Sequence, residues 1–308
     1  MIVASIDIGT NTVLLLIAEV QTSGEIKSML NEYRMPRIGN GTEKNGSISQ
    51  EKINLLMEVL KEYDNQIDKY RCEKVLVSGT NALRIAKNAP DIVRNVWELF
   101  NYKIDIISGD TEAEYAYLGA ISNIKGVEEP MVIDIGGGST ELIFGSKSEI
   151  LSKKSLPIGS VSATEKFLEK SPPSKEDIGR LKRKLNELLK EIVYPKKPSD
   201  VIAIAGTVTT LSCMNLGLKE FEEDKVEMSS ITMKEINKII EKLSGLTSPK
   251  ILENYGPVSK GRDDIILAGA IILSEIMNFF SIKSVKVSSR GIRYGAIVKY
   301  LKNLEKTS

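Results

Sequence analysis

The chain has 308 residues, of which 42% are hydrophobic and 27% charged, and this length and composition predict about two soluble globular domains. Its 42 lysines and arginines balance 41 aspartates and glutamates, so we do not expect a surface that coats nucleic acid or adheres to a membrane. Histidine is absent, which excludes Ser-His-Asp and Cys-His catalysis and every histidine-ligated metal site.

The cysteines and the apolar runs indicate the compartment. Cys72 and Cys213 lie 141 residues apart without a CxxC motif, which is typical of thiols in a reducing environment. No long apolar stretch precedes Asp7, so a signal peptide is not expected. The longest apolar run, Ile265–Leu273, is nine residues and too short to span a bilayer. We therefore predict a soluble, cytoplasmic protein with no membrane partner and no nucleic-acid partner.

The first half of the chain alternates between strand and helix patterns. Short β-rich runs at 2–7 and 13–20 flank a turn at Gly9–Thr12, and an amphipathic helix is predicted from about Ser49 to Lys69. Further buried strands are predicted at 75–78 and 104–108, and each runs directly into a helical pattern. This alternation favours a layered α/β domain.

The second half begins with the same pattern. Ile6-Asp7-Ile8-Gly9 matches Ile133-Asp134-Ile135-Gly136 at an offset of 127 residues, and strands at 131–134 and 140–144 flank the second turn. We interpret this as a duplicated α/β unit. The predicted domains are 1–126 and 127–308, with a C-terminal helix at about 291–305 that packs on the first domain.

Three further elements are predicted in the second half. Ser174 caps a helix with Asp177 at the capping-box position, and its core face is Ile178, Leu181, Leu185, Leu188 and Ile192. The opposite, basic face is either a solvated surface, which we favour, or a surface that attracts a polyanion. A buried strand at 201–205 leads into Gly206–Thr210, and a last strand is predicted near 285–288.

Four turns made of small residues follow predicted strands, at 9–12, 108–111, 136–140 and 206–210. Glycine in such turns lets backbone N–H groups approach an anion closely, so we predict phosphate binding. A single turn of this kind would be explained equally well by chain reversal. The residues that we assign to phosphate are Gly9, Thr10, Asn11, Gly136, Gly137, Gly138, Ser139, Gly206, Thr207 and Thr209.

Carboxylates accompany two of these turns. Asp7 and Asp134 end the strands that precede them, and Glu141 lies on the strand that returns from the second turn, so a hairpin would bring Asp134 and Glu141 together. Acids beside a phosphate are typical of a Mg²⁺ site, because the ion takes oxygen ligands. Asp7, Asp134 and Glu141 are therefore candidate metal ligands. For Asp7 alone, a solvent-facing acid at a strand end is the alternative.

Glu112 and a few arginines complete the set of candidates. Glu112 opens a helix, where a carboxylate is common because it interacts favourably with the helix dipole. Arginine is scarce, with ten residues against 32 lysines, and four arginines lie at element ends where a bidentate phosphate contact is feasible. These are Arg84, Arg262, Arg290 and Arg293, and we assign Arg84 and Arg293 to the substrate.

Taken together, the motifs resemble those of the exopolyphosphatase/guanosine pentaphosphate phosphatase (Ppx/GppA) family, within the superfamily of acetate kinase, sugar kinases, Hsp70 and actin. The most specific match is Ser108-Gly-x-x-Glu112-Ala followed 22 residues later by Asp134-Ile-Gly-Gly-Gly-Ser-Thr-Glu141. The other matching segments are Asp7–Asn11, Thr80–Asn88, Pro157–Val161, Gly206–Leu211, Arg262–Ile265 and Arg290–Arg293. They keep the family's order over nearly the whole chain.

The resemblance implies two ribonuclease-H-like (actin-like ATPase) domains with an active-site cleft between them. It also implies hydrolysis of a terminal phosphoanhydride bond with Mg²⁺ or Mn²⁺, releasing orthophosphate. On this basis Glu112 is the base that activates water, Asp134 and Glu141 support the metal and the water, and the Gly136 loop holds the terminal phosphate. Leu14, Ser162 and Tyr294 depart from the family pattern. Leu14 and Ser162 stand where a cation is frequent, and Tyr294 stands where an acid is frequent. The loss of the two cations bears on the affinity for substrate and on chain-length preference.

Several functions stay open at this point. The leading hypothesis is an exopolyphosphatase acting on inorganic polyphosphate, and the nearest alternative is a 5′-phosphatase of guanosine pentaphosphate. A kinase of the superfamily would transfer phosphate to an acceptor and would need an adenine pocket. A non-enzymatic actin-like filament or chaperone would polymerise or carry a peptide-binding domain. The sequence leaves the oligomeric state open, a homodimer included.

Overall fold

The computed structural model describes residues 1–124, 126, 128–146, 149–194, 198 and 200–307, and the chain divides into two compact units. Unit 1 comprises Met1–Ser122 together with Gly291–Ser308, and unit 2 comprises Asn123–Arg290. The boundary that we predict between residues 126 and 127 falls beside positions 125 and 127, which lie outside the described residues.

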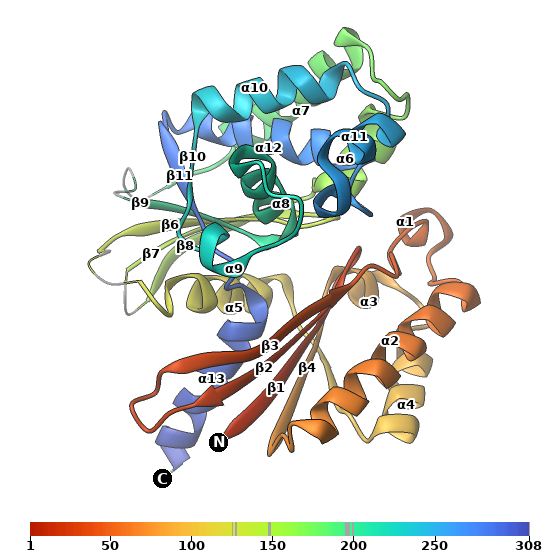
Figure 1. Ribbon diagram of the computed structural model, residues 1–308, viewed down its shortest axis with the longest axis vertical. Coiled ribbons are helices and arrows are strands. Elements are labelled where there is room, and N and C mark those ends of the chain that lie inside the picture. The colour runs from red at the N-terminus through yellow and green to blue at the C-terminus, as the bar shows by residue number, and fades with distance from the viewer. Residues whose placement is uncertain (125, 127, 147–148, 195–197, 199, 308) are drawn as a thin grey trace. The chain divides into compact units, whose positions relative to one another are not determined.

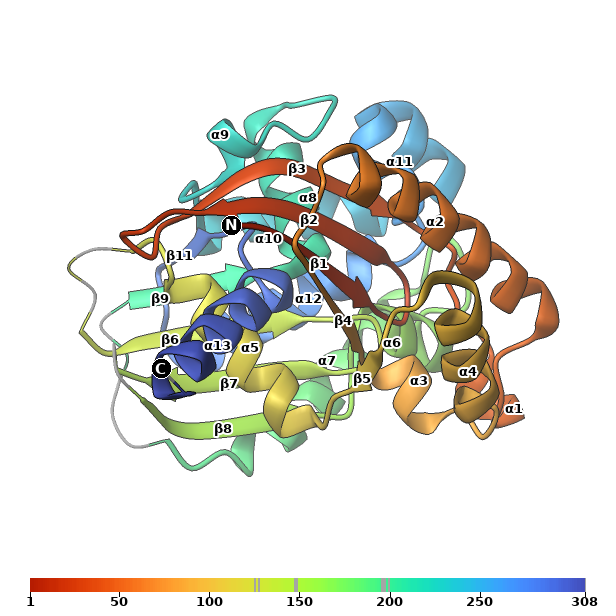
Figure 2. The ribbon, with the colours of Figure 1, turned by 90° about the horizontal axis from the view of Figure 1, so that it is seen from below.

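Unit 1 is built on a five-stranded mixed sheet with the strand order β3-β2-β1-β4-β5 (Figures 1 and 2). The strands are β1 (Ile2–Ile8), β2 (Val13–Val20), β3 (Ile26–Arg34), β4 (Lys74–Gly79) and β5 (Ile104–Ile106). β1, β2 and β3 pair antiparallel, whereas β4 and β5 run parallel to β1. The predicted hairpin is confirmed, since Ile8 pairs with Val13 across the turn at residues 9–12.

Helices pack on both faces of this sheet, because residues of β1 and β2 alternate between two apolar clusters (Figure 1). Ile6 and Leu15 face α2 and α4, while Val3 and Leu16 face Tyr294 of α13. The helices of unit 1 are α1 (Thr42–Asn45), α2 (Gln50–Lys69), α3 (Asn81–Ile85), α4 (Ala89–Phe100), α5 (Gly109–Ile121) and α13 (Ile292–Thr307). The C-terminal helix α13 therefore completes the core of the unit in which the chain begins.

Unit 2 contains a six-stranded sheet with the order β10-β11-β9-β6-β7-β8. The strands are β6 (Pro130–Ile135), β7 (Thr140–Gly145), β8 (Ile150–Leu156), β9 (Asp200–Ile204), β10 (Ser230–Thr232) and β11 (Ser284–Val287). β6, β7 and β8 form an antiparallel meander, and β9 and β11 run parallel to β6. Figure 2 shows the order of β9, β6, β7 and β8 along the sheet.

One face of the unit 2 sheet carries the largest apolar core of the chain. Met131, Ile133 and Leu142 pack with residues of α7, α8 and α12, and α12 is buried almost throughout. The helices are α6 (Ser160–Phe167), α7 (Lys175–Lys190), α8 (Ala205–Leu216), α9 (Glu223–Val226), α10 (Met233–Ser244), α11 (Ser248–Tyr255), the 3₁₀ helix η1 (Gly256–Ser259) and α12 (Ile266–Phe279). The predicted capping box at the start of α7 is confirmed between Ser174 and Asp177.

The two units repeat one strand arrangement. An antiparallel meander of three strands is followed by parallel strands on the side of its first strand, as β3-β2-β1-β4-β5 in unit 1 and as β8-β7-β6-β9-β11 in unit 2. The registers also agree, because Asp7 pairs with Leu14 and Asp134 pairs with Glu141, each pair separated from its counterpart by 127 residues. This common register supports our interpretation of the sequence repeat as a duplication.

Three strands were not predicted, and two predicted turns are wrong. The predicted turn at 108–111 is the start of α5, with Ser108 as its N-cap residue. β3, β8 and β10 carry charged or polar side chains and lie at or near sheet edges, so they lack the apolar run of a buried strand. The segment Gly206–Thr210 is not a turn but part of α8, which begins at Ala205 directly after β9. Ala205 has a φ of 74°, and this left-handed residue allows strand and helix to join without a loop.

Two other observations concern the helices of the described residues. None of their helices is both long enough and apolar enough to cross a bilayer. On α7, Arg180, Lys182 and Lys184 each form an ion pair with an acid of unit 2, as expected for a solvated basic face.

The crossing of α5 and α13 in unit 1 depends on two glycines. A Cβ atom on Gly295 would lie 1.8 Å from the carbonyl oxygen of Tyr115, and one on Gly119 would lie 2.1 Å from the carbonyl oxygen of Gly291. Backbone atoms cannot withdraw from such a contact without moving a helix. We expect Gly295→Ala to lower the free energy of unfolding by roughly 2–3 kcal/mol, since overpacking of this kind costs typically 1–3 kcal/mol.

The matched control is Gly179→Ala in α7, where the nearest atom to a new Cβ is Arg183 Nη1 at 3.5 Å. There the substitution should stabilise the helix by roughly 0.5–1 kcal/mol. Thermal and urea unfolding of the two variants give the comparison. Equal stability of Gly295→Ala and wild type would mean that the two helices are not tightly packed at this point.

Candidate functional site

The first glycine turn joins β1 to β2 and presents backbone donors. Gly9 N–H donates to the Thr12 carbonyl at 2.9 Å, which closes the turn. The carbonyls of Thr10 and Asn11 accept hydrogen bonds from Gly39 and Arg37. Within the described residues, the N–H groups of Thr10, Asn11 and Thr12 donate no backbone hydrogen bond. Hydrogen bonds to its carbonyls and the engaged Gly9 N–H thus hold the turn, and the N–H groups of residues 10–12 stay candidates for anion binding. Phosphate binding by Gly9, Thr10 and Asn11 stays a prediction.

Asp7 is the next-to-last residue of β1, beside this turn, and is 7% exposed. Its Oδ1 atom and the Nδ2 atom of Asn11 are buried and have no hydrogen-bond partner within the described residues. Burial raises the pKa of Asp7 to about 7, the negative charge of Glu112 adds to the rise, and Arg293 opposes it. The solvent-facing alternative for Asp7 is therefore wrong. A buried, unpaired carboxylate oxygen is an available ligand for a cation.

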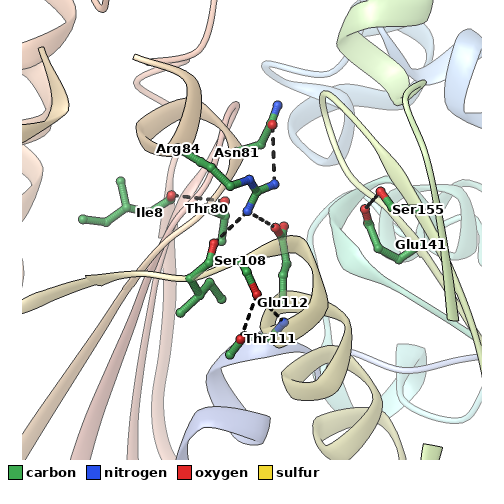
Figure 3. A network of polar contacts seen from close by, with 10 residues as sticks. Ile8, Thr80, Asn81, Arg84, Ser108, Thr111, Glu112, Glu141 and Ser155 are labelled. Carbon is green, nitrogen blue, oxygen red and sulfur yellow. Dashed lines mark hydrogen bonds and ion pairs between the residues drawn. The ribbon is translucent and has the colours of Figure 1, made fainter. Parts of the chain in front are cut away.

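Glu112 lies in the first turn of α5 and is held by an arginine of α3 (Figure 3). Ser108 caps this helix, because its Oγ accepts a hydrogen bond from Thr111 N–H at 3.1 Å. Arg84 Nη1 donates to Glu112 Oε2 at 2.9 Å, and only 11% of the Glu112 side chain is exposed. Burial raises the pKa of Glu112, and the charge and hydrogen bond of Arg84 act in the opposite direction.

Thr80 links the strand ends of unit 1 next to this network. It follows β4, and its Oγ1 donates to the Ile8 carbonyl at the end of β1 (Figure 3). Because β1 and β4 are parallel neighbours, their carboxyl ends bring Asp7, Thr80 and the Arg84 helix to one edge of the sheet. In the sequence Thr80 is visible only as the first residue of the matching segment Thr80–Asn88.

The second glycine turn, in unit 2, is braced by helix α6. The N–H groups of Ser160 and Val161 donate to the carbonyls of Gly136 and Gly137 at 2.9 Å, and Ser162 Oγ donates to the Gly138 carbonyl. Within the described residues, the N–H groups of Gly137, Gly138 and Ser139 donate no backbone hydrogen bond. The second turn therefore repeats the arrangement of the first, with carbonyls engaged and amides available.

Asp134 and Glu141 lie opposite each other on β6 and β7 and are both buried. The prediction that a hairpin brings them together is confirmed. Glu141 Oε1 also accepts a hydrogen bond from Ser155 Oγ of β8 at 2.7 Å (Figure 3). Ser155 was missed, since a serine between Lys154 and Leu156 on an edge strand carries no motif.

The residues predicted around Gly206 lie in the first turns of α8, not in an open loop. Thr207 is buried with its methyl group against Gly269 of α12, and Thr209 Oγ1 donates to the carbonyls of Ala205 and Gly206. A Cβ on Gly206 would lie 2.1 Å from Arg262 Nη2, so the guanidinium lies directly over this glycine. Arg262 therefore meets the amino end of α8, although we had not assigned it to the site.

Arg293 is 7% exposed and lies within unit 1. Its Nη1 donates to the Leu15 carbonyl at 3.0 Å and to Asn31 Oδ1 at 2.6 Å. These contacts join α13 to β2 and β3. A role of Arg293 in phosphate binding stays a prediction, whereas its structural role is evident from these hydrogen bonds.

The three positions that depart from the family pattern have different surroundings. Leu14 pairs with Asp7 in the β1–β2 hairpin and is partly exposed. Ser162 braces the second glycine turn through its hydroxyl group. Tyr294 is fully buried in the cluster between the sheet of unit 1 and α13.

The carboxylates fit a divalent ion of the Mg²⁺ type. Within the described residues no group of three or more His, Cys, Asp or Glu side chains forms an all-protein metal site. Mg²⁺ does not require one, because it keeps several waters and is commonly held by one or two carboxylates together with substrate phosphates. The buried pair Asp134 and Glu141 and the unpaired oxygen of Asp7 have this character.

Comparison with known proteins defines the class to which this fold and these sites belong. The model of the Ppx/GppA phosphatase family matches residues 16–304. The crystal structure of the Aquifex aeolicus member of the Ppx/GppA family superposes with a TM-score of 0.86 and 31% identity, covering 100% of this chain and 99% of that one. The protein thus has the two-sheet α/β fold of this phosphatase family, and the predicted α/β class is confirmed.

The chain belongs to the Ppx/GppA phosphatase family. It is 34% identical to a bifunctional 3-dehydroquinate synthase/phosphatase of Fusobacterium nucleatum over 97% of this chain, but it spans only 46% of that longer protein. It is 29% identical to exopolyphosphatase 2 of Mycobacterium tuberculosis, over 89% of both chains. The resemblance inferred from the motifs is therefore confirmed.

The buried carboxyl of Asp7 predicts how stability changes with pH when no metal is bound. A carboxyl whose pKa is raised from 3.8 to about 7 binds its proton more tightly in the folded state. Its contribution to stability is present below pH 4 and is lost as the pH rises through 7. We expect Asp7→Asn to flatten this dependence and to raise the melting temperature at pH 8 in EDTA.

Melting curves between pH 4 and pH 8 test this. The control is Asp105→Asn, because the Asp105 side chain in unit 1 is exposed to solvent. The control should keep the pH dependence of wild type. A variant Asp7→Asn that melts below wild type at pH 8 would show that the carboxylate is stabilised by groups other than those described.

Proposed function

We propose that the protein is an exopolyphosphatase, which hydrolyses the terminal phosphoanhydride bond of inorganic polyphosphate and releases orthophosphate. Glu112 carries the proposal, because it is a buried carboxylate in the unit that holds the first glycine turn and is held in one orientation by Arg84. The family of phosphatases and the similarity to an exopolyphosphatase along nearly the whole chain support the choice of substrate.

In this proposal Glu112 is the general base. A water oxygen attacks the terminal phosphorus, the bridging P–O bond breaks, and the shortened polyphosphate leaves with the electron pair of that bond. The proton of the water passes to the Glu112 carboxylate, which must therefore be ionised beforehand. The Arg84 guanidinium favours the ionised form against the effect of burial. No covalent enzyme intermediate is needed, in keeping with the absence of histidine.

The glycine turns and the carboxylates have separate roles. The free N–H groups at 10–12 and 137–139 are donors for phosphate oxygens, and such donors act without reorganisation during the reaction. Asp134 and Glu141 in unit 2 and Asp7 in unit 1 are the residues that we propose as ligands of Mg²⁺ or Mn²⁺. When bound, the ion supplies neutralisation of phosphate charge.

A direct assay decides between the substrates that remain open. Orthophosphate release is measured side by side from short polyphosphate, long polyphosphate, guanosine pentaphosphate and ATP. We expect polyphosphate to be the best substrate. Faster release from guanosine pentaphosphate would assign the protein to the other activity in the family name, and release from none of the four would overturn the proposal.

We expect Glu112→Gln to keep the fold and to lower kcat by roughly 10²- to 10⁴-fold, the range for loss of a general base. The amide keeps the shape of the side chain but cannot take a proton. Steady-state kinetics with polyphosphate measures the effect. The control is Glu114→Gln, two residues further along α5, where the Glu114 carboxylate pairs with Lys299. An equal loss of kcat in both variants would indicate damage to the helix and not to the chemistry.

We expect Asp134→Asn and Glu141→Gln to raise the Mg²⁺ concentration needed for half-maximal activity, as well as to lower kcat. Removing a carboxylate removes charge and an oxygen ligand from the ion. Titration of Mg²⁺ against activity is the measurement, with the exposed Glu187→Gln of α7 as control. Unchanged half-saturating Mg²⁺ in both variants would place the ion elsewhere.

We expect water to be the acceptor of the phosphoryl group, which separates a hydrolase from a kinase of the same superfamily. In oxygen-18 water the released orthophosphate should carry one heavy oxygen atom per cleavage. Addition of ADP should yield little ATP. Stoichiometric ATP, or orthophosphate without the label, would support the kinase alternative.

A further inference from the structure

The guanidinium of Arg84 joins two parts of unit 1 that are distant in the sequence. Nη1 donates to the carbonyl of Ile107 at 2.8 Å and to Glu112 Oε2 at 2.9 Å, while Nη2 makes a long contact of 3.5 Å with Asn81 Oδ1 (Figure 3). Arg84 belongs to α3, whereas Ile107 and Glu112 flank the start of α5. One side chain therefore contacts both the backbone that enters α5 and the carboxylate of its first turn.

These two contacts constrain Glu112 in different ways. Ile107 directly precedes Ser108, the N-cap residue of α5, so its hydrogen bond fixes the position at which the helix begins. The bond to Oε2 fixes the rotation of the Glu112 side chain on that helix. A buried carboxylate with one oxygen engaged keeps the other, Oε1, as its acceptor for a proton.

The same contacts occupy Nη1, one of the guanidinium nitrogens through which an arginine can meet a phosphate. An Nη atom of arginine carries two hydrogens, and both acceptors of Nη1 belong to the protein. A bidentate phosphate contact through Nη1 would have to break one of them. The charge of the guanidinium is also offset by a carboxylate at 2.9 Å, which weakens its attraction for a polyanion.

We propose that Arg84 is a positioning residue for Glu112, and that it acts on the reaction through this carboxylate and not as a ligand of the substrate. The proposal rests on the function proposed above, in which Glu112 is the base. It differs from our prediction from the sequence, which assigned Arg84 to phosphate. The prediction from this geometry is that Arg84 affects kcat only when Glu112 is present.

A double-mutant cycle tests this with polyphosphate as substrate and saturating Mg²⁺. We expect Arg84→Ala to lower kcat by roughly 10- to 100-fold, the scale of misplacing a catalytic group, with KM within about threefold of wild type. In the Glu112→Gln background the same change should lower kcat by less than about threefold, because no base is left to position. Guanidinium ion should partly restore kcat of Arg84→Ala but not of the double variant.

Two further variants complete the design. Arg84→Lys keeps the charge but cannot span both acceptors as the planar group does, so it should lose kcat while KM is kept. It serves the same test if Arg84→Ala does not fold. Arg94→Ala is the control, since this arginine of α4 is 63% exposed in its side chain and pairs only at the surface with Asp91; wild-type kinetics are expected.

The outcomes separate the two proposals. A rise in KM of about tenfold or more that is equal in both backgrounds, with a flatter dependence of KM on salt, would make Arg84 a substrate ligand and overturn the positioning role. Wild-type protein that releases orthophosphate from none of the four substrates would instead overturn the proposed function. A loss of kcat confined to the background with Glu112 supports the role proposed here.

Discussion

A carboxylate withdrawn from water must be paired, hydrogen-bonded or protonated. This constraint applies to the buried carboxylates of both units, Asp7 and Glu112 in unit 1 and Asp134 and Glu141 in unit 2. Glu112 is paired with Arg84, and Glu141 accepts a hydrogen bond from Ser155. Asp7 has one oxygen buried without a partner in the part of the chain that the structure describes, and burial raises its pKa to about 7, which favours the protonated form. Such an arrangement persists only where the surrounding fold holds it in place, and it is common at functional sites.

The fold holds these groups in place through the ends of its strands. Each unit has an antiparallel hairpin whose turn offers amides, followed by a parallel strand that leads into a helix. In unit 1 the helix α5 adds Glu112, the base that we propose, while in unit 2 the residue opposite Asp134 is Glu141. The two copies of the duplicated unit therefore carry different side chains at equivalent positions. Leu14 lies opposite Asp7 in the first copy, where Glu141 lies opposite Asp134 in the second.

Much of this arrangement could be predicted from the sequence, because local patterns determine it. Alternation and small-residue turns identify the β1–β2 and β6–β7 hairpins, and the register of a two-stranded hairpin then fixes that Asp134 faces Glu141. The capping box at Ser174 is likewise local. The partners of Arg84 and Arg293 could not be predicted, since they lie 28 and 278 residues away in the sequence and depend on how separate elements pack. The prediction of a turn at 206–210, where α8 in fact begins, was wrong because nothing in the sequence marks Ala205 as left-handed.

The return of the chain to unit 1 has a consequence for its synthesis. Unit 2 is one continuous segment, whereas unit 1 lacks α13 until residues 292–307 have been made, and Tyr294 and Ile297 of that helix belong to its core. On the ribosome, unit 2 can thus complete its core first, while the N-terminal sheet waits with one apolar face uncovered. A nascent or truncated chain that ends before Gly291 would expose Val3, Leu16 and their neighbours, and would be the form that chaperones and proteases encounter.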